Sequence, residues 1–214
     1  MLRSRTLYLL LSSCLLLLFA CTPMHKQMKP ATGDVAGLSK FKPQFGTALY
    51  STQVDVVGNH LSGLLMIKKM PDSSLRMVFS NEVGFKFFDF EFSPEGKFKV
   101  YSVIKQMNKK AVLKTLRKNF ELVLMERLDP AAASVYTKDG LLYFVFPQSK
   151  GFYYYITNST GKELVRMERA SNKKTVVEAI MRNYKSGIPD TIGISHNAFN
   201  FTIALKRLER NVTE

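Results

Sequence analysis

Cysteine is nearly absent from this 214-residue chain: only Cys14 and Cys21 occur, and both lie within the first 21 residues. The rest of the chain has no thiol that could form a disulfide bond. It is long enough for a domain that buries well over half of its unfolded surface. We therefore expect a single domain that is stabilised by its hydrophobic core alone.

Catalytic motifs are also missing. The chain has no Gly-x-Ser-x-Gly elbow, no phosphate-binding glycine loop and no zinc-type His/Glu motif. Of its three histidines, His25 falls in a predicted linker, His60 at the start of a strand and His196 in a turn, so we expect no metal and no other cofactor. Asp89 and Glu91 share one side of a predicted strand and are the best remaining pair for acid–base hydrolysis. We expect them to form a solvated strand face instead, and we predict no catalytic residue.

Acidic residues are absent from residues 1–20, which carry Arg3 and Arg5 and then an apolar run that is short for a bilayer span. This order is typical of a secretory signal. The run ends in Leu-Phe-Ala-Cys at residues 18–21, which resembles the lipobox of bacterial lipoproteins. We expect cleavage before Cys21 and lipidation of Cys21, which would anchor the chain to a membrane. The alternative is an ordinary secretory signal in which Cys21 is incidental.

Two further features bear on location and partners. By resemblance to Gram-negative lipoproteins, Thr22 after the cysteine implies transport to the outer membrane. No acidic tract follows it, which favours the periplasmic face over the cell surface. Lys and Arg outnumber Asp and Glu by 31 to 17, so anionic partners are favoured. In an envelope these would be anionic lipid head groups or lipopolysaccharide and not nucleic acid; alternatively, the basic residues only solubilise the sheet.

Proline and glycine interrupt residues 21–43, and this polar composition predicts a flexible lipidated tether. A single β-rich domain is expected over 44–210. Apolar residues there alternate with polar ones between closely spaced turn signals, which predicts an antiparallel meander. The expected strands cover roughly 45–57, 60–69, 75–81, 85–92, 97–104, 134–139, 141–147, 152–157, 162–169 and 173–184, followed by strands around 192–194 and 199–205.

One segment, 108–125, has helical spacing of Val112, Leu116 and Phe120 after Asn108, a residue type that caps helices. We expect this long helix to lay its apolar stripe on the concave face of the sheet. Residues 175–184 also fit a helix, but their consecutive valines and the neighbouring meander favour a strand.

Several predicted strands are apolar on both faces. In 140–147, for example, both sets of alternating residues are hydrophobic, and a single sheet cannot bury two faces unless something covers each. The excess indicates either the ordinary core of a strongly bent sheet or a cavity for an apolar ligand. The candidate ligand-binding residues are four strand aromatics and two residues of the predicted helix, which would serve as a lid: Phe88, Phe90, Phe144, Phe146, Leu116 and Phe120.

The lipobox, the tether, the antiparallel run from Gln44, the mid-chain helix and the closing order Tyr184-x4-Pro189-x2-Ile192-x-Ile194 then Phe199-x-Phe201-x-Ile203-x-Leu205 together resemble the LolA/LolB-like family. The resemblance implies a mainly β fold with minor α: a strongly curved antiparallel sheet, or half-barrel, covered by one long helix. It further implies that the apolar cavity holds the acyl chains of lipoproteins. LolB-like receivers also insert an exposed apolar loop into the membrane, for which the sequence shows no equivalent.

The sequence therefore supports two main hypotheses. The first is a non-enzymatic, membrane-anchored periplasmic lipoprotein that binds an acyl chain, a lipid or a lipoprotein in an apolar cavity. The alternative is a structural accessory subunit of an envelope protein complex, with a filled core. A hydrolase that uses Asp89 and Glu91 ranks below both.

Overall fold

Thirteen strands pair into one continuous antiparallel sheet in the computed structural model, which describes residues 24–56, 58–126 and 128–209. Their order across the sheet is β1-β7-β8-β9-β10-β11-β12-β13-β2-β3-β4-β5-β6. The strand bounds are β1 (Lys29–Pro30), β2 (Thr47–Val56), β3 (Asn59–Lys69), β4 (Leu75–Ser80), β5 (Lys86–Phe92), β6 (Phe98–Val103), β7 (Ser134–Lys138), β8 (Leu141–Pro147), β9 (Phe152–Asn158), β10 (Leu164–Ala170), β11 (Thr175–Lys185), β12 (Ile188–His196) and β13 (Phe201–Arg207).

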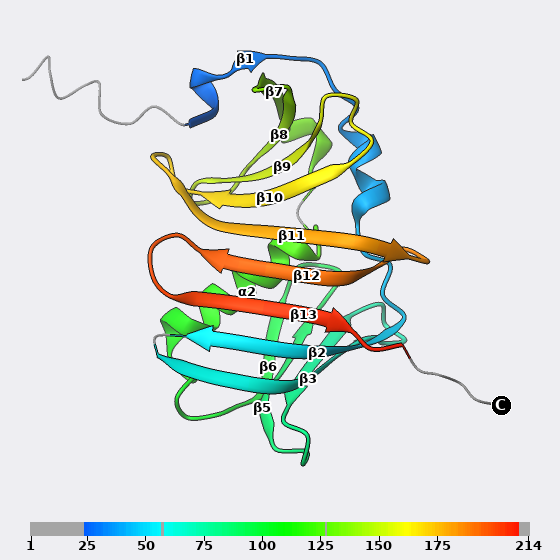
Figure 1. Cartoon of the computed structure of the whole chain (residues 1–214), viewed down its shortest axis with the longest axis vertical. Helices are drawn as coiled ribbons and strands as arrows, with labels where there is room; N and C mark the ends of the chain where they lie inside the picture. The colour runs from blue at the N-terminus through cyan, green and yellow to red at the C-terminus, as the bar shows by residue number, and fades with distance from the viewer. Residues whose placement is uncertain (1–23, 57, 127, 210–214) are drawn as a thin grey trace, which may run out of the picture.

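Two meanders make up this sheet, β2–β6 and β7–β13, and they are joined because the last strand, β13, pairs with β2. The helix α2 (Lys110–Val123) connects the first meander to the second. Figure 1 shows the sheet curving around this helix: α2 lies behind β12 and β13, while β5 and β6 turn behind β2 and β3. The predicted fold class, a strongly curved antiparallel sheet covered by one long helix, is confirmed.

Local sequence patterns predicted the bounds of most strands and of the helix to within a few residues. Residues 175–185 form a strand, as the paired valines favoured, because their alternate side chains face the core in register with β12. In β13 the buried residues Phe201, Ile203 and Leu205 alternate with more exposed ones. The helix begins at Lys110, and its N-cap is Lys109, which makes no side-chain cap. The expected capping role of Asn108 is therefore wrong.

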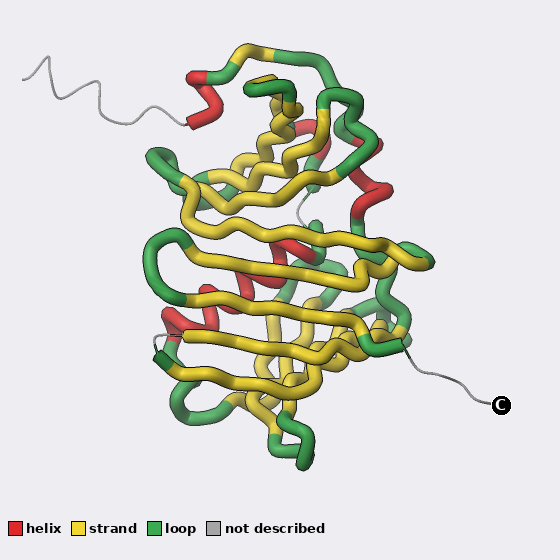
Figure 2. The backbone as a smooth tube through the Cα atoms, in the orientation of Figure 1, coloured by secondary structure: helices red, strands yellow, loops and turns green. Residues whose placement is uncertain are grey.

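The segment before β2 differs from the flexible tether expected over 21–43. From residue 24 onward it lies along the sheet (Figure 2), as two 3-10 helices, η2 (Met24–Gln27) and η3 (Ala36–Phe41), with β1 between them pairing with β7. His25, Met28 and Leu38 are buried. The segment contains prolines and glycines and follows an extended path. Its few apolar residues pack against the sheet.

The buried residues form two cores on opposite faces of the sheet. The larger lies between the concave face and α2. The smaller lies on the outer face of β8, β9 and β10, where the segment around Met28 covers it: Met28, Tyr143, Val145, Tyr154, Ile156 and Ala170. The two apolar faces of 140–147 are thus both covered, the inner face through Phe144 and Phe146 and the outer face through the segment before β2.

The connection between α2 and β7 contains a short 3-10 helix, η4 (Pro130–Ala132).

Within the described residues, no helix is both long enough and apolar enough to span a membrane. The predicted signal at 1–20 and the lipidation site Cys21 lie outside the described residues, so both stay predictions.

Candidate functional site

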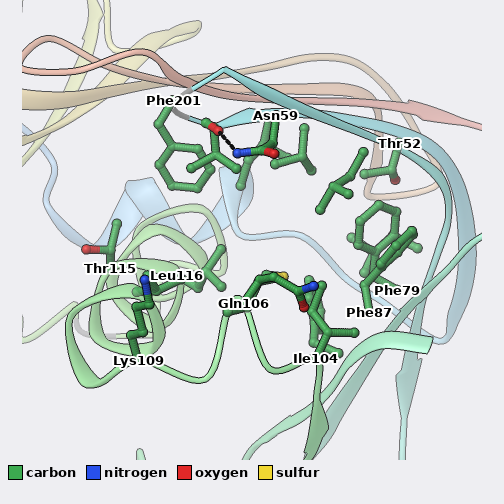
Figure 3. Close-up of a pocket in the computed structure, with 18 of the residues that line it drawn as sticks. Thr52, Asn59, Phe79, Phe87, Ile104, Gln106, Lys109, Thr115, Leu116 and Phe201 are labelled. Atoms are coloured by element: carbon green, nitrogen blue, oxygen red, sulfur yellow. Dashed lines mark hydrogen bonds between the residues drawn. The ribbon is translucent and has the colours of Figure 1, made fainter.

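A cavity of about 840 Å³ lies between the sheet and the N-terminal half of α2. Figure 3 shows its two walls: Thr52, Phe79 and Phe201 come from the sheet, while Lys109, Thr115 and Leu116 come from the helix and its approach. The residues between β6 and α2, including Ile104 and Gln106, complete the wall opposite the sheet. A volume of this size falls within the usual range for small-molecule sites, about 300–1,000 Å³.

The lining is predominantly apolar. Its hydrophobic members come from β2–β5, β13, α2 and the connections beside them: Val54, Val56, Leu61, Leu65, Phe79, Phe85, Phe87, Phe88, Ile104, Met107, Ala111, Val112, Leu116, Phe120, Phe199, Phe201 and Ile203. Few polar side chains join them: Thr52, Asn59, Gln106, Lys109 and Thr115. Such a surface favours a hydrocarbon chain and offers a polar group only a few partners.

The aromatic wall of the cavity is held by ring packing. Phe79 lies with its ring centroid 4.7 Å from that of Phe87 and 5.6 Å from that of Phe88. Phe88 in turn stacks on Phe90 at 4.3 Å. Aromatic pairs at these separations stabilise one another beyond simple burial. The wall is therefore built by the protein itself and does not need a ligand to form.

Three of the six predicted site residues line this cavity and three do not. Phe88, Leu116 and Phe120 are lining residues. Phe90 is fully buried and stacks on Phe88, while Phe144 and Phe146 are buried in the concave core away from the cavity lining. All six belong to the concave core. The alternation of residues along a strand and the spacing of residues along a helix identify the face on which a residue lies. They do not identify its position along the half-barrel.

The other lining residues were missed although their strands were predicted. Phe201 and Ile203 carry the same alternation signal as the chosen aromatics, since they fall on the buried side of the last strand. Only the pairing of β13 with β2 brings them to the cavity. That pairing joins residues about 150 positions apart, so no local sequence pattern predicts it.

Exposed apolar side chains gather at the rim. Phe85 is 57% exposed and Phe199 is 44% exposed, and both line the cavity. Beside Phe85, Val83 is 89% exposed in the turn between β4 and β5. This turn is held by Asn81, whose Oδ1 accepts a hydrogen bond from the Phe85 backbone N–H at 2.8 Å. No exposed apolar loop was expected from the sequence, and the structure shows one here.

The two carboxylates considered for hydrolysis each bond to another side chain. Asp89 is only 3% exposed, so the expected solvated position is wrong for this residue. Its carboxylate accepts two hydrogen bonds from the Arg76 guanidinium, at 2.6 and 2.9 Å. Glu91 accepts a hydrogen bond from the Tyr101 hydroxyl at 3.0 Å. Both carboxylates thus have structural partners.

The three histidines lie apart. His25 Nδ1 is 3.0 Å from the Tyr154 hydroxyl on the outer face, and burial lowers the pKa of His25. His60 pairs with Asp55 at 2.7 Å at an exposed position. His196 is on the inner face, at the end of β12. Among the described residues, no three His, Cys, Asp or Glu side chains are grouped to hold a metal ion.

Comparison with known proteins agrees on the fold. A scan against protein-family models matched none, and a search of curated proteins found no relative. A crystal structure of a LolA superfamily protein from Nitrosomonas europaea matches 84% of this chain and 93% of its own, with a TM-score of 0.50 and 8% identity. At this identity the likeness concerns the fold alone, and the chain has a LolA-like fold.

Two further structures match with a lower TM-score of 0.42. One is a DUF1329 family protein from Desulfovibrio piger, 9% identical, with 81% of this chain and 90% of that chain covered. The other is an outer membrane lipoprotein-sorting protein domain from Vibrio parahaemolyticus, 10% identical, with 84% and 92% covered.

Proposed function

We propose that this chain is a non-enzymatic lipoprotein of the cell envelope that binds an acyl chain, of a lipid or of a lipoprotein, in the cavity beneath α2. The observation that carries the proposal is the preformed apolar hollow of about 840 Å³. Burial of hydrocarbon there would release its hydration water, at about 0.8 kcal/mol per methylene group. A filled core, as an accessory subunit would have, predicts no such space.

The anchor and location are part of the same proposal. The lipobox ending at Cys21 supports lipidation, Thr22 supports the outer membrane, and the lack of an acidic tract supports its periplasmic face. Receivers of the LolB type use an exposed apolar loop at the membrane, and the turn with Val83 and Phe85 offers such a loop at the rim of the cavity. A ligand could therefore pass between membrane and cavity along an apolar rim.

The test uses the chain from Thr22 to Glu214, which keeps every described residue, and the neutral apolar dye N-phenyl-1-naphthylamine. Val112 lines the cavity from α2, so Val112→Trp places an indole in the hollow. We expect dye affinity to fall at least tenfold, because the added ring occupies the space that the dye needs. Titration followed by fluorescence measures the affinity.

Lys114→Trp provides the matched control, since Lys114 is an exposed residue of the same helix and does not line this cavity. It should leave dye affinity unchanged, while mass spectrometry should find lipid co-purifying with the wild-type chain. Failure of the wild-type chain to bind dye or lipid would overturn the proposal. A stoichiometric protein partner found by in-cell crosslinking would then favour the accessory subunit.

A further inference from the structure

A polar cluster lies on the concave face, beside the cavity and beneath α2. Arg169 is paired across the strands with Tyr153 on one side and Val177 on the other, and Val177 is paired with His196. Directly paired residues point to the same face of a sheet. Because Tyr153 and Val177 belong to the core between sheet and helix, Arg169 and His196 face inward with them.

The helix closes over this row of residues. The Tyr153 hydroxyl donates a hydrogen bond to the Lys118 carbonyl at 3.5 Å. One residue further, Asn119 is fully buried, and its Nδ2 lies 3.0 Å from His196 Nε2. With the amide nitrogen donating, His196 Nε2 is the acceptor and its ring proton resides on Nδ1. Nδ1 is then a hydrogen-bond donor.

Three buried polar atoms of the cluster have no hydrogen-bond partner within the described part of the chain: Arg169 Nε, His196 Nδ1 and Asn119 Oδ1. Buried polar groups in native proteins are nearly always hydrogen-bonded, because an unmade bond leaves the desolvation cost uncompensated. Two of these three atoms are N–H donors, and they come from one cation and one neutral ring. Such a set fits a ligand that accepts hydrogen bonds.

The charge at this position is uncompensated as well. Burial lowers the pKa of Arg169, and the nearby Tyr153 hydroxyl opposes this effect. An arginine stays protonated in proteins even so. Burial and the neighbouring Arg169 lower the pKa of His196 to about 4, so His196 is neutral near pH 7.

Other partly buried arginines of the sheet and helix differ from Arg169 because they have carboxylate partners. Each forms an ion pair with a carboxylate at 2.6 or 2.7 Å: Arg76 with Asp89, Arg117 with Glu121, Arg166 with Glu168, and Arg207 with Asp190. The fold thus supplies counter-charges to arginines as a rule. Arg169 is an exception on the face that surrounds the cavity.

The cluster reaches the apolar hollow through His196, whose ring packs on two lining residues of the cavity. The His196 ring centroid lies 4.7 Å from that of Phe199 and 4.8 Å from that of Phe201, and both phenylalanines line the cavity. Asn119 precedes the lining residue Phe120 on α2. A ligand with its chain in the hollow could therefore extend one polar end to these side chains.

We propose that Arg169 and His196, with Asn119 beside them, form an anion site that binds the carboxylate or phosphate head group of a single-chain amphiphile whose hydrocarbon chain occupies the cavity. The guanidinium offers paired N–H donors that match either group, and the low-dielectric surroundings strengthen the contact. The Asn119 side chain positions the His196 ring. This inference rests on the proposed function, because it assigns the polar end of the same ligand.

The experiment compares probes that share a sixteen-carbon chain: palmitate, 1-palmitoyl lysophosphatidate and 1-hexadecanol. Each competes with the neutral dye for the chain from Thr22 to Glu214. We expect the better of the two anions to bind at least tenfold more tightly than the alcohol. Whichever anion binds better identifies the head group, carboxylate or phosphate.

The variant Arg169→Met keeps most of the apolar stem and removes the charge. It should abolish the preference for anions and leave the affinity for 1-hexadecanol within about twofold, since only the head-group contact is lost. Arg182→Met is the matched control, because Arg182 is an exposed arginine on the adjacent strand β11. This control should keep the full preference.

A second measurement needs no variant. In palmitate labelled with ¹³C at the carboxyl carbon, the pKa of the bound carboxylate should fall below its value in water, because a guanidinium favours the charged form. Equal affinity for acid and alcohol, together with an unshifted carboxyl pKa, would overturn the anion site and leave chain binding intact. If neither the three probes nor the dye bind, the proposed function itself fails.

Discussion

At the scale of single residues, Asp89 illustrates how a carboxylate can be buried in an aromatic strand. The Arg76 guanidinium bonds both of its oxygens, and the Lys86 ammonium lies 3.7 Å away. Arg76 also lies 3.6 Å over the ring of Tyr101, which holds the guanidinium in place. Asp89 therefore has a structural role, fixing β5 to β4 beside the aromatic wall.

Replacing this carboxylate should destabilise the protein. Asp89→Asn keeps the size of the side chain but leaves the Arg76 charge without its partner, which costs about 3 kcal/mol for a buried pair. Because Arg76 is 26% exposed, we expect roughly 2 kcal/mol in urea unfolding. Glu91→Gln, on the same side of the strand, should cost less than about 0.5 kcal/mol. Equal effects of the two variants would contradict the structural role of Asp89.

Side-chain identity alone could not separate Asp89 from Glu91 in the sequence. Both alternate with phenylalanines, and alternation predicts which residues share a face, not whether that face is wet. The pairing of β4 with β5 places Arg76 next to Asp89 in space, although the two lie 13 positions apart. The same limit applies to Arg169 and His196, whose proximity depends on the register of three strands.

At the scale of elements, the segment before β2 acts as a cover for the outer face of the sheet. Met28 is 7% exposed among residues of β8, β9 and β10, and His25 packs its ring 4.6 Å from that of Phe152. This segment buries apolar surface that the sheet would otherwise expose. Because few residues of this segment are apolar, its composition alone predicted a tether.

A polar residue at the centre of this cover should weaken the whole domain. Met28→Asp would bury an unpaired charge or release the segment from the sheet, and we expect a loss of about 2–4 kcal/mol. Lys26→Asp introduces the same residue two positions earlier at an exposed site, and should change stability by less than about 0.5 kcal/mol. Thermal and urea unfolding measure both; a silent Met28→Asp would mean that the segment does not contribute to the fold.

Regular elements were more predictable than this cover. The strands and the helix follow from alternation and helical spacing, which are local signals of the sequence. The half-barrel shape was expected from the resemblance to the LolA/LolB-like family and from the excess of apolar residues. The segment of residues 24–43 has neither period, because its two short 3-10 helices and two-residue strand are set by the surface beneath them.

At the scale of the whole molecule, the interior beneath α2 is divided along the helix. Toward the C-terminal end of the helix, Leu122 and Val123 are almost fully buried, and Tyr155 donates a hydrogen bond to the Leu122 carbonyl at 3.2 Å. Toward the N-terminal end, Val112 and Ala111 border the cavity. One end therefore supports the fold, while the other leaves room for a ligand.

This division predicts a gradient of local stability. Without ligand, amide hydrogen exchange should be slow in β9–β12 and faster in residues 104–116. Residues 104–116 border the cavity, so local unfolding there breaks fewer packing contacts. Palmitate should slow exchange in 104–116, and in the nearby turn 196–201, while leaving β8 and β9 unchanged, since binding stabilises only what it contacts or orders. Exchange followed by mass spectrometry resolves these segments. Uniform slowing across the sheet, or protection confined to β8 and β9, would contradict a ligand site at the hollow end.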